Sequence, residues 1–139
     1  MINTDFDIEQ RANQAVEYFL SGYNCAQSVY MAYADLFNIS PQNAARTAAP
    51  FGAGMGRLRE VCGTVTGMFL IVGQAIPCDD PNDSVNRNHN YALVQKLAER
   101  FRQENSSIVC RELLESRKRP CADLVKNAAK MIGEELKMM

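Results

Sequence analysis

The residues best suited to chemistry in this 139-residue sequence are its five cysteines. Three of them, Cys25, Cys110 and Cys121, fall at or just after residues typical of a helix start. At such a position the unpaired backbone N–H groups and the positive end of the helix dipole stabilise a thiolate. The thiolate is the form of cysteine that acts as a nucleophile and as a metal ligand. The cysteine positions therefore predict thiol chemistry.

The fourth cysteine of interest, Cys62, follows a loop from Phe51 to Arg57 with three glycines at alternate positions. Arg57 and Arg59 bring positive charge near Cys62, which also favours a thiolate. We expect this loop to be a tight turn that docks against the core. A second interpretation is that its N–H groups, with one of the two arginines, bind an anion or a carboxylate.

Gly63 and Gly67 are four residues apart and would share one helix face. Each costs up to about 1 kcal/mol of helix stability relative to alanine, which indicates that another group approaches the backbone there. That group is either a neighbouring helix or a cofactor or substrate beside Cys62. The second interpretation makes Gly63, Gly67 and Arg57 candidate cofactor-binding residues, and the first allows a homodimer through this face.

Apolar residues recur at helical spacing along most of the chain, which predicts an all-α protein. Several of the expected helices are short, and we expect a compact bundle of about six helices. The segment from Arg59 to Ile76 is apolar almost all round and is predicted to be the buried central helix. The expected helices span residues 7–20, 24–38, 40–49, 59–76, 83–104, 108–115 and 120 onward.

Length and a hydrophobic content of 47% fit a single domain over residues 1–139. The formal net charge of -1 gives no general attraction to phosphate, so we expect neither nucleic acid nor an anionic membrane surface as a partner. The most hydrophobic stretch, residues 65–76, is well short of the roughly 20 residues needed to span a bilayer. The first ten residues do not resemble a secretory signal, so we expect a cytoplasmic protein.

Stable disulfides are uncommon in a reducing compartment, so the cysteines are expected to be thiols, metal ligands or transient redox partners. Burial is an equally good explanation, because Cys25, Cys62 and Cys121 fall on apolar stripes and free cysteine is often buried. No spacing is C-x-x-C, so neither a thioredoxin-type motif nor a zinc knuckle is indicated. His89, the single histidine, lies among polar residues and is expected to be solvated.

The sequence also resembles the C_GCAxxG_C_C family, whose redox activity is inferred from its cysteines. The resemblance implies a helical bacterial or archaeal protein, often encoded near transporters or oxidoreductases that would supply its redox partner. Four cysteines match the family pattern, Cys78 matches none, and Thr64 stands where the family has alanine. The matching segments are Gly22-Tyr23-Asn24-Cys25-Ala26-Gln27, the glycine loop, Glu60-Val61-Cys62-Gly63-Thr64-Val65-Thr66-Gly67, Cys110-Arg111-Glu112-Leu113-Leu114 and Cys121.

Three functions are compatible with these patterns. In the first, Cys25, Cys62, Cys110 and Cys121 are catalytic and carry out dithiol–disulfide exchange or electron transfer, with Cys25–Cys62 and Cys110–Cys121 as the expected pairs. In the second, the same four thiolates bind zinc or an iron–sulfur cluster. In the third, they are core residues of a structural or partner-binding bundle. The sequence does not decide whether the protein is an enzyme, nor its substrate.

Overall fold

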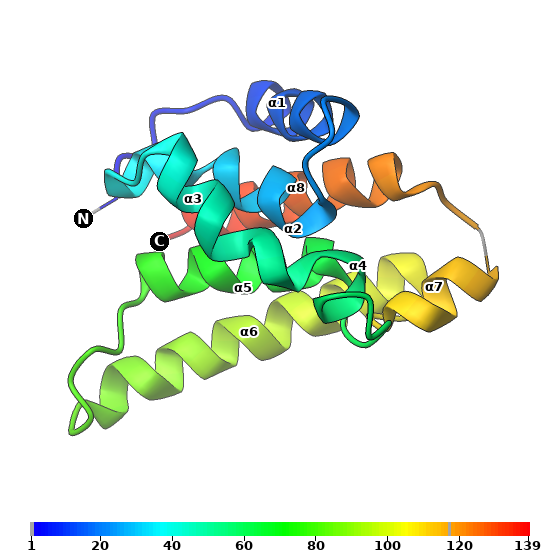
Figure 1. Cartoon of the computed structure of the whole chain (residues 1–139). Coiled ribbons are helices and arrows are strands. Elements are labelled where there is room, and N and C mark those ends of the chain that lie inside the picture. Colours follow the sequence, from blue (N-terminus) through cyan, green and yellow to red (C-terminus); the bar gives the residue numbers. More distant parts are fainter. Residues whose placement is uncertain (1, 117) are drawn as a thin grey trace.

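The computed structural model describes residues 2–116 and 118–139, and these are helical and contain no strand (Figure 1). The predicted all-α class is confirmed, with seven right-handed α-helices in the described residues rather than about six. They are α1 (Ile8–Leu20), α2 (Cys25–Met31), α3 (Pro41–Ala48), α5 (Gly63–Ala75), α6 (Ser84–Asn105), α7 (Cys110–Ser116) and α8 (Cys121–Lys137). Three short turns complete the set: η1 (Ala34–Phe37), η2 (Ala49–Phe51) and α4 (Gly52–Met55).

Helix starts follow local capping chemistry, which is why the sequence predicts them well. Asp7, Asn24, Ser40 and Asp83 each accept a hydrogen bond from the backbone N–H three residues further on. Such a cap stabilises the helix, and with it the protein, by about 0.5–2 kcal/mol. At α2 the cap is reciprocal, because the Gln27 side chain also accepts from the Asn24 backbone N–H at 3.0 Å.

Two predicted helix starts are wrong for one common reason. The central helix was expected from Arg59, but α5 begins at Gly63, because Val61 pairs antiparallel with Val109 in an isolated β-bridge. The backbone N–H of Cys62 donates to the carbonyl of Ile108 at 2.7 Å. The same pairing delays the helix expected from Ile108, which begins two residues later. The partners lie nearly fifty residues apart, so no local pattern indicates the bridge.

The helix expected over residues 24–38 is also shorter than predicted. α2 ends at Met31, the chain continues into the 3-10 turn η1, and Asn38 closes that turn in the left-handed conformation with φ 59°. Asparagine adopts this conformation more readily than most residues. The shortened α2 begins at Cys25, and this first turn is the part of the helix that matters most for the site described below.

The helices stack in layers around α5 (Figure 1). α1 packs across α2 and α8, these two pack on α5, and α6 covers the opposite side of α5. The buried central position predicted for this segment is therefore confirmed, with Val65, Met68, Ile71 and Val72 fully buried. α2, α5 and α8 all begin at the same end of the molecule, on the right in Figure 1. This shared direction brings their N-termini together.

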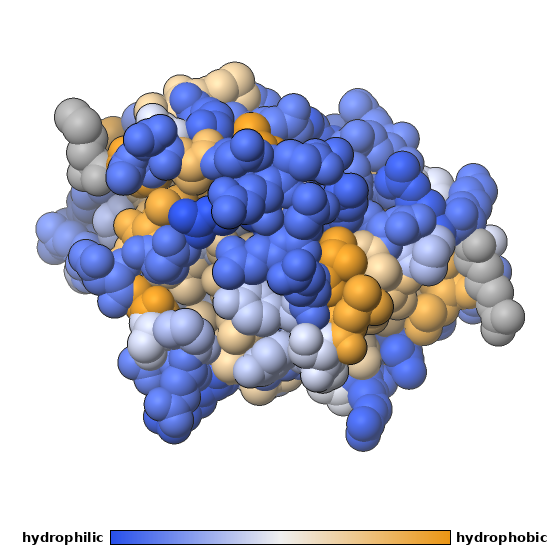
Figure 2. All heavy atoms as spheres, turned by 90° about the horizontal axis from the view of Figure 1, so that it is seen from above, coloured by the Kyte–Doolittle hydropathy of each residue, from blue (hydrophilic) through white to orange (hydrophobic). Residues whose placement is uncertain are grey.

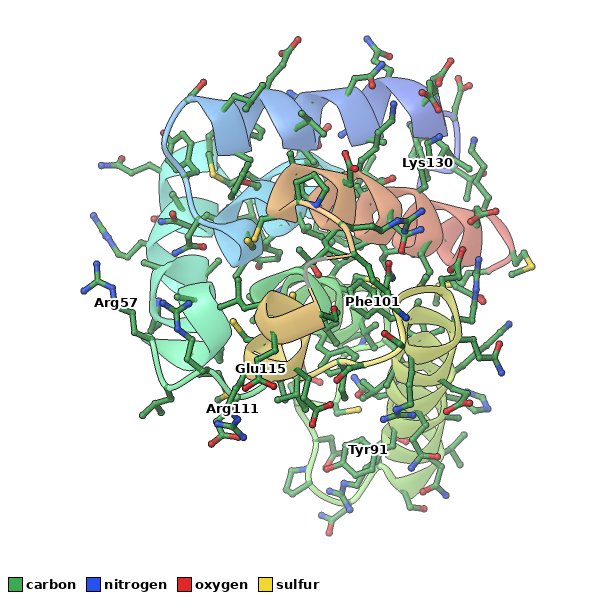
Figure 3. The ribbon with its side chains drawn as sticks, turned by 90° about the vertical axis from the view of Figure 1, so that its right-hand side faces the viewer. Arg57, Tyr91, Phe101, Arg111, Glu115 and Lys130 are labelled. Carbon is green, nitrogen blue, oxygen red and sulfur yellow. The ribbon has the colours of Figure 1, made fainter. Side chains whose placement is uncertain are left out.

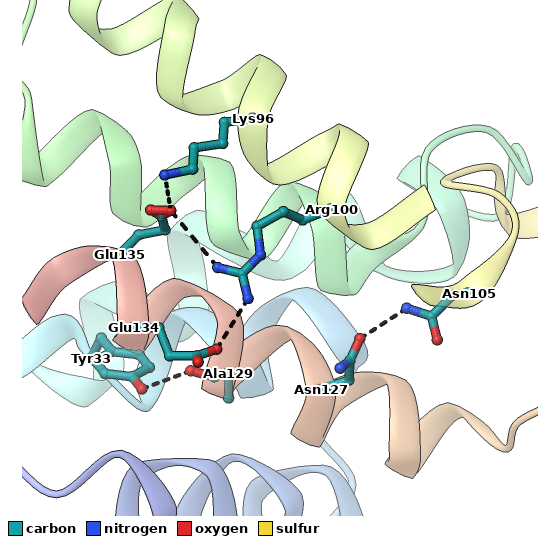
Figure 4. Close-up of polar contacts among 8 residues, drawn as sticks. All are labelled: Tyr33, Lys96, Arg100, Asn105, Asn127, Ala129, Glu134 and Glu135. Carbon is teal, nitrogen blue, oxygen red and sulfur yellow. Dashed lines mark hydrogen bonds and ion pairs between the residues drawn. The ribbon is translucent and has the colours of Figure 1, made fainter. Parts of the chain in front are cut away.

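Polar contacts fasten α6 to α8 (Figure 4). Glu135 of α8 is only 4% exposed, and its Oε1 lies 2.7 Å from Lys96 Nζ and 3.7 Å from an Arg100 nitrogen. Asn105 at the end of α6 donates to the Asn127 side chain at 2.8 Å. The two helices are thus joined near both the C-terminal turn of α8 and its first turns.

The face over α1 is mostly hydrophilic, with apolar side chains in small, separate patches (Figure 2). No helix in residues 2–116 and 118–139 combines the length and the apolar character needed to cross a membrane.

Candidate functional site

All four cysteines of the predicted site stand at helix N-termini. Cys25, Cys110 and Cys121 are the first residues of α2, α7 and α8, and Cys62 is the N-cap of α5. The prediction that the thiols lie at or near helix starts is confirmed. Four helix N-termini meet at this end of the molecule, which makes the surroundings electropositive.

The four cysteines line one cavity of about 230 Å³. The view of Figure 3 is onto this end of the molecule, with α7 in front. Apolar side chains make up most of the remaining wall, and two arginines, Arg59 and Arg119, are its charged members. The other lining residues are Phe19, Asn24, Ala53, Gly54, Gly63, Leu113, Leu114 and Leu124.

Close packing of α2 against α5 brings Cys25 and Cys62 to the same cavity. A Cβ on Gly63 would lie 3.1 Å from the Cys25 Cβ, and one on Gly67 would lie 3.0 Å from the Val29 Cβ. The group that approaches the two glycines is therefore a neighbouring helix of the same chain. α2 covers this face, so it is not available for the homodimer considered above, and Gly67 does not line the cavity.

The glycine loop is a left-handed turn. Ala53, Gly54, Met55, Gly56 and Arg57 all have φ between 55° and 69°. Each non-glycine residue in this conformation costs about 1–2 kcal/mol, so the surrounding structure must hold the turn in place. The N–H groups of residues 56, 58, 59 and 60 donate to carbonyls within the turn. They are already paired, which favours the tight-turn interpretation over the anion site.

The turn places Arg59, and not Arg57, at the cysteines. A Cβ on Gly54 would lie 2.7 Å from both the Arg59 Cα and the Cys110 Cβ, so only glycine fits between them. Arg59 then reaches the Cys110 Sγ at 3.8 Å. Arg57 is exposed, points away from the ribbon in Figure 3 and does not line the cavity. The predicted contribution of Arg57 to a cofactor site has no support in this placement.

Cys25 and Cys121 are neighbouring thiols whose pKa values are shifted in opposite directions. The hydrogen bond from Cys25, with help from nearby Arg59, lowers the pKa of Cys121 to about 6 despite its partial burial. The same hydrogen bond, together with burial, raises the pKa of Cys25 far above its usual range. The interaction therefore favours the proton on Cys25 and the negative charge on Cys121.

Cys62 and Cys110 are the more deeply buried thiols, with exposures of 5% and 9%. Burial raises the pKa of Cys62, although a contact of 3.1 Å with the Thr64 hydroxyl partly opposes this effect. The two residues are diagonal neighbours across the Val61–Val109 bridge. Diagonal positions in such a pair are about 7–8 Å apart, at or beyond the usual limit for a disulfide.

The contacts differ from the pairs expected from the sequence. Cys25 is hydrogen-bonded to Cys121, whereas Cys62 and Cys110 lie on either side of the bridge. Cys25 still lies close to Cys62, as the Gly63 contact indicates. Among the described residues, no group of three or more His, Cys, Asp or Glu side chains is arranged to hold a metal ion. This geometry gives no support to the zinc or iron–sulfur interpretation.

Two further residues lie where the sequence led us to expect them, and a third was not predicted to belong to the site. Cys78 is exposed in the loop before α6, outside the cavity, and His89 is exposed on α6. Arg119 was not among the site residues expected from the sequence, yet it lines the cavity. Its position two residues before Cys121 was the available signal, since a residue just before a helix lies near that helix's first turn.

The comparison with protein families identifies the class of protein to which these features belong. Residues 23–135 match the family described as "Putative redox-active protein (C_GCAxxG_C_C)". The chain belongs to this family, as the resemblance in its sequence implied. No curated protein and no solved structure matches the chain.

Proposed function

We propose that this protein is a thiol–disulfide redox protein in which Cys121 is the attacking nucleophile and Cys25 resolves the intermediate. The observation that carries the proposal is that Cys25 and Cys121 line one cavity, where the interaction between the two thiols favours negative charge on Cys121 and a proton on Cys25. A reactive thiolate next to a second thiol is the minimum machinery for disulfide exchange.

The exchange proceeds in two steps. The Cys121 thiolate attacks one sulfur of a substrate disulfide, and a mixed disulfide forms while the other substrate sulfur leaves as a thiolate that takes up a proton. Cys25 then loses its proton and attacks the Cys121 sulfur, which expels the second substrate thiolate. The substrate gains two electrons, and the protein is oxidised to a Cys25–Cys121 disulfide. The reverse sequence oxidises a dithiol substrate.

The two cysteines are assigned their roles from their surroundings. Cys121 is less buried than Cys62 or Cys110 and begins the seventeen-residue helix α8, whose dipole favours its negative charge. A lowered pKa favours the thiolate form of Cys121 and also makes it a good leaving group. Cys25 lies deeper and holds its proton, as a resolving cysteine should until the first step is complete.

Cys62 and Cys110 have a secondary place in this scheme. Cys62 lines the same cavity as Cys25, and in this scheme it attacks a Cys25–Cys121 disulfide at the Cys25 sulfur, which expels the low-pKa Cys121 thiolate. The product would be the Cys25–Cys62 pair expected from the sequence, with Cys121 free for another reaction. Cys110 keeps Arg59 at the site through its 3.8 Å contact.

The direct test is peptide mapping by mass spectrometry after reaction with bis(2-hydroxyethyl) disulfide, a small neutral disulfide. We expect the first internal disulfide to join Cys25 and Cys121. Cys25→Ser should accumulate the mixed disulfide on Cys121, and Cys121→Ser should lose rapid reaction altogether. Cys78→Ser is the matched control, because Cys78 lies outside the cavity, and it should behave like the wild-type protein.

Two results would overturn the proposal. One is that Cys121 reacts no faster than the exposed Cys78. The other is that alanine at each of the four cavity cysteines changes only the stability of the fold, which would support the structural-bundle alternative. Metal bound in stoichiometric amount by the anaerobically purified protein would instead support the metal-binding alternative.

A further inference from the structure

The cavity has a charged group that the exchange reaction does not use. Arg119 lines the cavity, and its guanidinium donates to the Asn105 side chain at 2.8 Å. Asn105 is itself held by Asn127 and by the Phe101 carbonyl. A neutral amide thus orients Arg119, and no ion pair among the described residues involves it.

The second arginine of the cavity is already engaged. Arg59 contacts the Cys110 sulfur and stabilises the Cys121 thiolate, so its charge is partly balanced inside the site. In the part of the chain that the structure describes, the guanidinium of Arg119 donates instead to the neutral Asn105 amide. The adjoining hollow, which shares Leu113, Arg119 and Leu124 with the cysteine cavity, is also lined by one carboxylate, Glu104, and one further cation, Lys118.

The rest of the wall limits the size and polarity of what can bind. The cavity volume of about 230 Å³ is below the roughly 300–1,000 Å³ of pockets for drug-sized ligands. Phe19, Leu113, Leu114 and Leu124 present apolar surface. A small molecule with an apolar body and one acidic group complements this combination.

From this arrangement we propose that the substrate is a low-molecular-weight disulfide with a carboxylate, which Arg119 binds while the apolar part lies against the leucine and phenylalanine side chains. The inference rests on the proposed function and specifies its substrate class. A guanidinium presents several N–H groups in one plane and can bind a carboxylate through two of them. Arg119 is then a specificity residue that positions the disulfide for Cys121.

The test compares two aromatic disulfides that differ in charge: 5,5′-dithiobis(2-nitrobenzoate), a dicarboxylate, and 4,4′-dithiodipyridine, which is neutral at pH 7.5. Stopped-flow absorbance measures the rate of each reaction with the reduced protein. Each rate is divided by that of a small model thiol to remove the intrinsic reactivity of the reagent. We expect Arg119→Gln to slow the carboxylate reagent about tenfold, as for a lost charge-assisted hydrogen bond, and to leave the neutral reagent within twofold.

Arg111→Gln is the matched control. Arg111 is exposed on α7 at the same end of the molecule, as Figure 3 shows, and it does not line the cavity. Arg111→Gln removes the same charge as Arg119→Gln and should change the reaction rates of both reagents by the same factor. Equal effects of Arg119→Gln and Arg111→Gln on the carboxylate reagent would overturn the inference and leave the proposed function intact. Failure of both reagents to react at Cys121 in the wild-type protein would instead refute the proposed function.

Discussion

The two ends of α8 each carry an ionisable group, half-buried at one end and almost fully buried at the other. At the first residue, Cys121 lies beside the Cys25 thiol and close to Arg59. In the last turn, Glu135 is almost fully buried and lies against Lys96 and Arg100. The first group borders an open cavity, whereas the second is covered by the side chains that neutralise it.

The helix dipole accounts for this difference. A negative charge is stabilised at a helix N-terminus and destabilised at a C-terminus. Cys121 therefore needs only one hydrogen-bond donor and one nearby arginine, and its sulfur stays accessible. Glu135 lies at the unfavourable end and has two cations beside it. The comparison shows how one helix can favour negative charge on a thiol at one end and hold a structural ion pair at the other.

The ends also differ in what their backbone requires. The cysteine end depends on the left-handed turn and on Gly54, where a side chain has no room. The Glu135 end is held by side-chain contacts between regular helices, α6 and α8. We therefore expect added side-chain volume to destabilise the cysteine end of the protein, and loss of a charge to destabilise the Glu135 end.

The largest effect should come from Gly54→Ala. The added methyl would meet Arg59 and Cys110 at 2.7 Å, so the turn must shift, and we expect a loss of about 2–3 kcal/mol in the free energy of unfolding. Gly73→Ala is the control, because its methyl meets nothing within 4 Å and should stabilise α5 by about 0.5–1 kcal/mol. Urea denaturation measures both, and equal stabilities would contradict a shape-dependent cysteine end.

The charge of Glu135 should have the next largest effect. Glu135→Gln keeps the shape of the side chain but removes its attraction to Lys96 and Arg100, and we expect a loss of about 1–2 kcal/mol. The loss is limited because both cations are partly exposed and can turn to water. Glu134→Gln, at a half-exposed position, should change stability by less than about 0.5 kcal/mol. Thermal unfolding of both variants would measure the difference.

The pH profile of Cys121 tests the hydrogen bond at the other end. Alkylation by iodoacetamide should rise through a midpoint near pH 6 and level off above it, because the thiolate is the reactive form and deprotonation occurs as the pH rises. Cys25→Ala should move the midpoint upward, toward the pKa of 9.0 of an ordinary thiol. Cys25→Ser, which keeps a hydroxyl donor, should move it less. A midpoint that Cys25→Ala leaves unchanged would show that Cys25 does not lower the pKa of Cys121.

Arg59→Gln should produce a smaller upward shift of the same midpoint. The Coulombic effect of Arg59 on Cys121 is weaker than the hydrogen bond from Cys25, so the shift should stay below that of Cys25→Ala. Arg57→Gln removes the same charge from an exposed neighbouring position and should leave the profile unchanged. Equal shifts in the two arginine variants would indicate a general field effect instead of a local contact.

Sequence reasoning succeeded at this protein where the signal is local. The N-caps Asp7, Asn24, Ser40 and Asp83 satisfy backbone groups within three residues, so the helix starts could be read directly. The same reasoning failed at Arg59 and Ile108, where backbone groups pair across the Val61–Val109 bridge. The tight turn at the glycine loop was expected, but its left-handed course and its delivery of Arg59 depend on contacts with Cys110.

The sequence by itself determined an all-α protein, its family and four cysteines at or near helix starts, because caps, apolar periodicity and motif spacing are properties of neighbouring residues. The tertiary structure decided which thiols meet. Cys25 and Cys121 are distant in the chain, and they come together only because α2, α5 and α8 begin at one end of the bundle. Packing between helices sets that arrangement, on which the roles proposed for Cys121 and Cys25 depend.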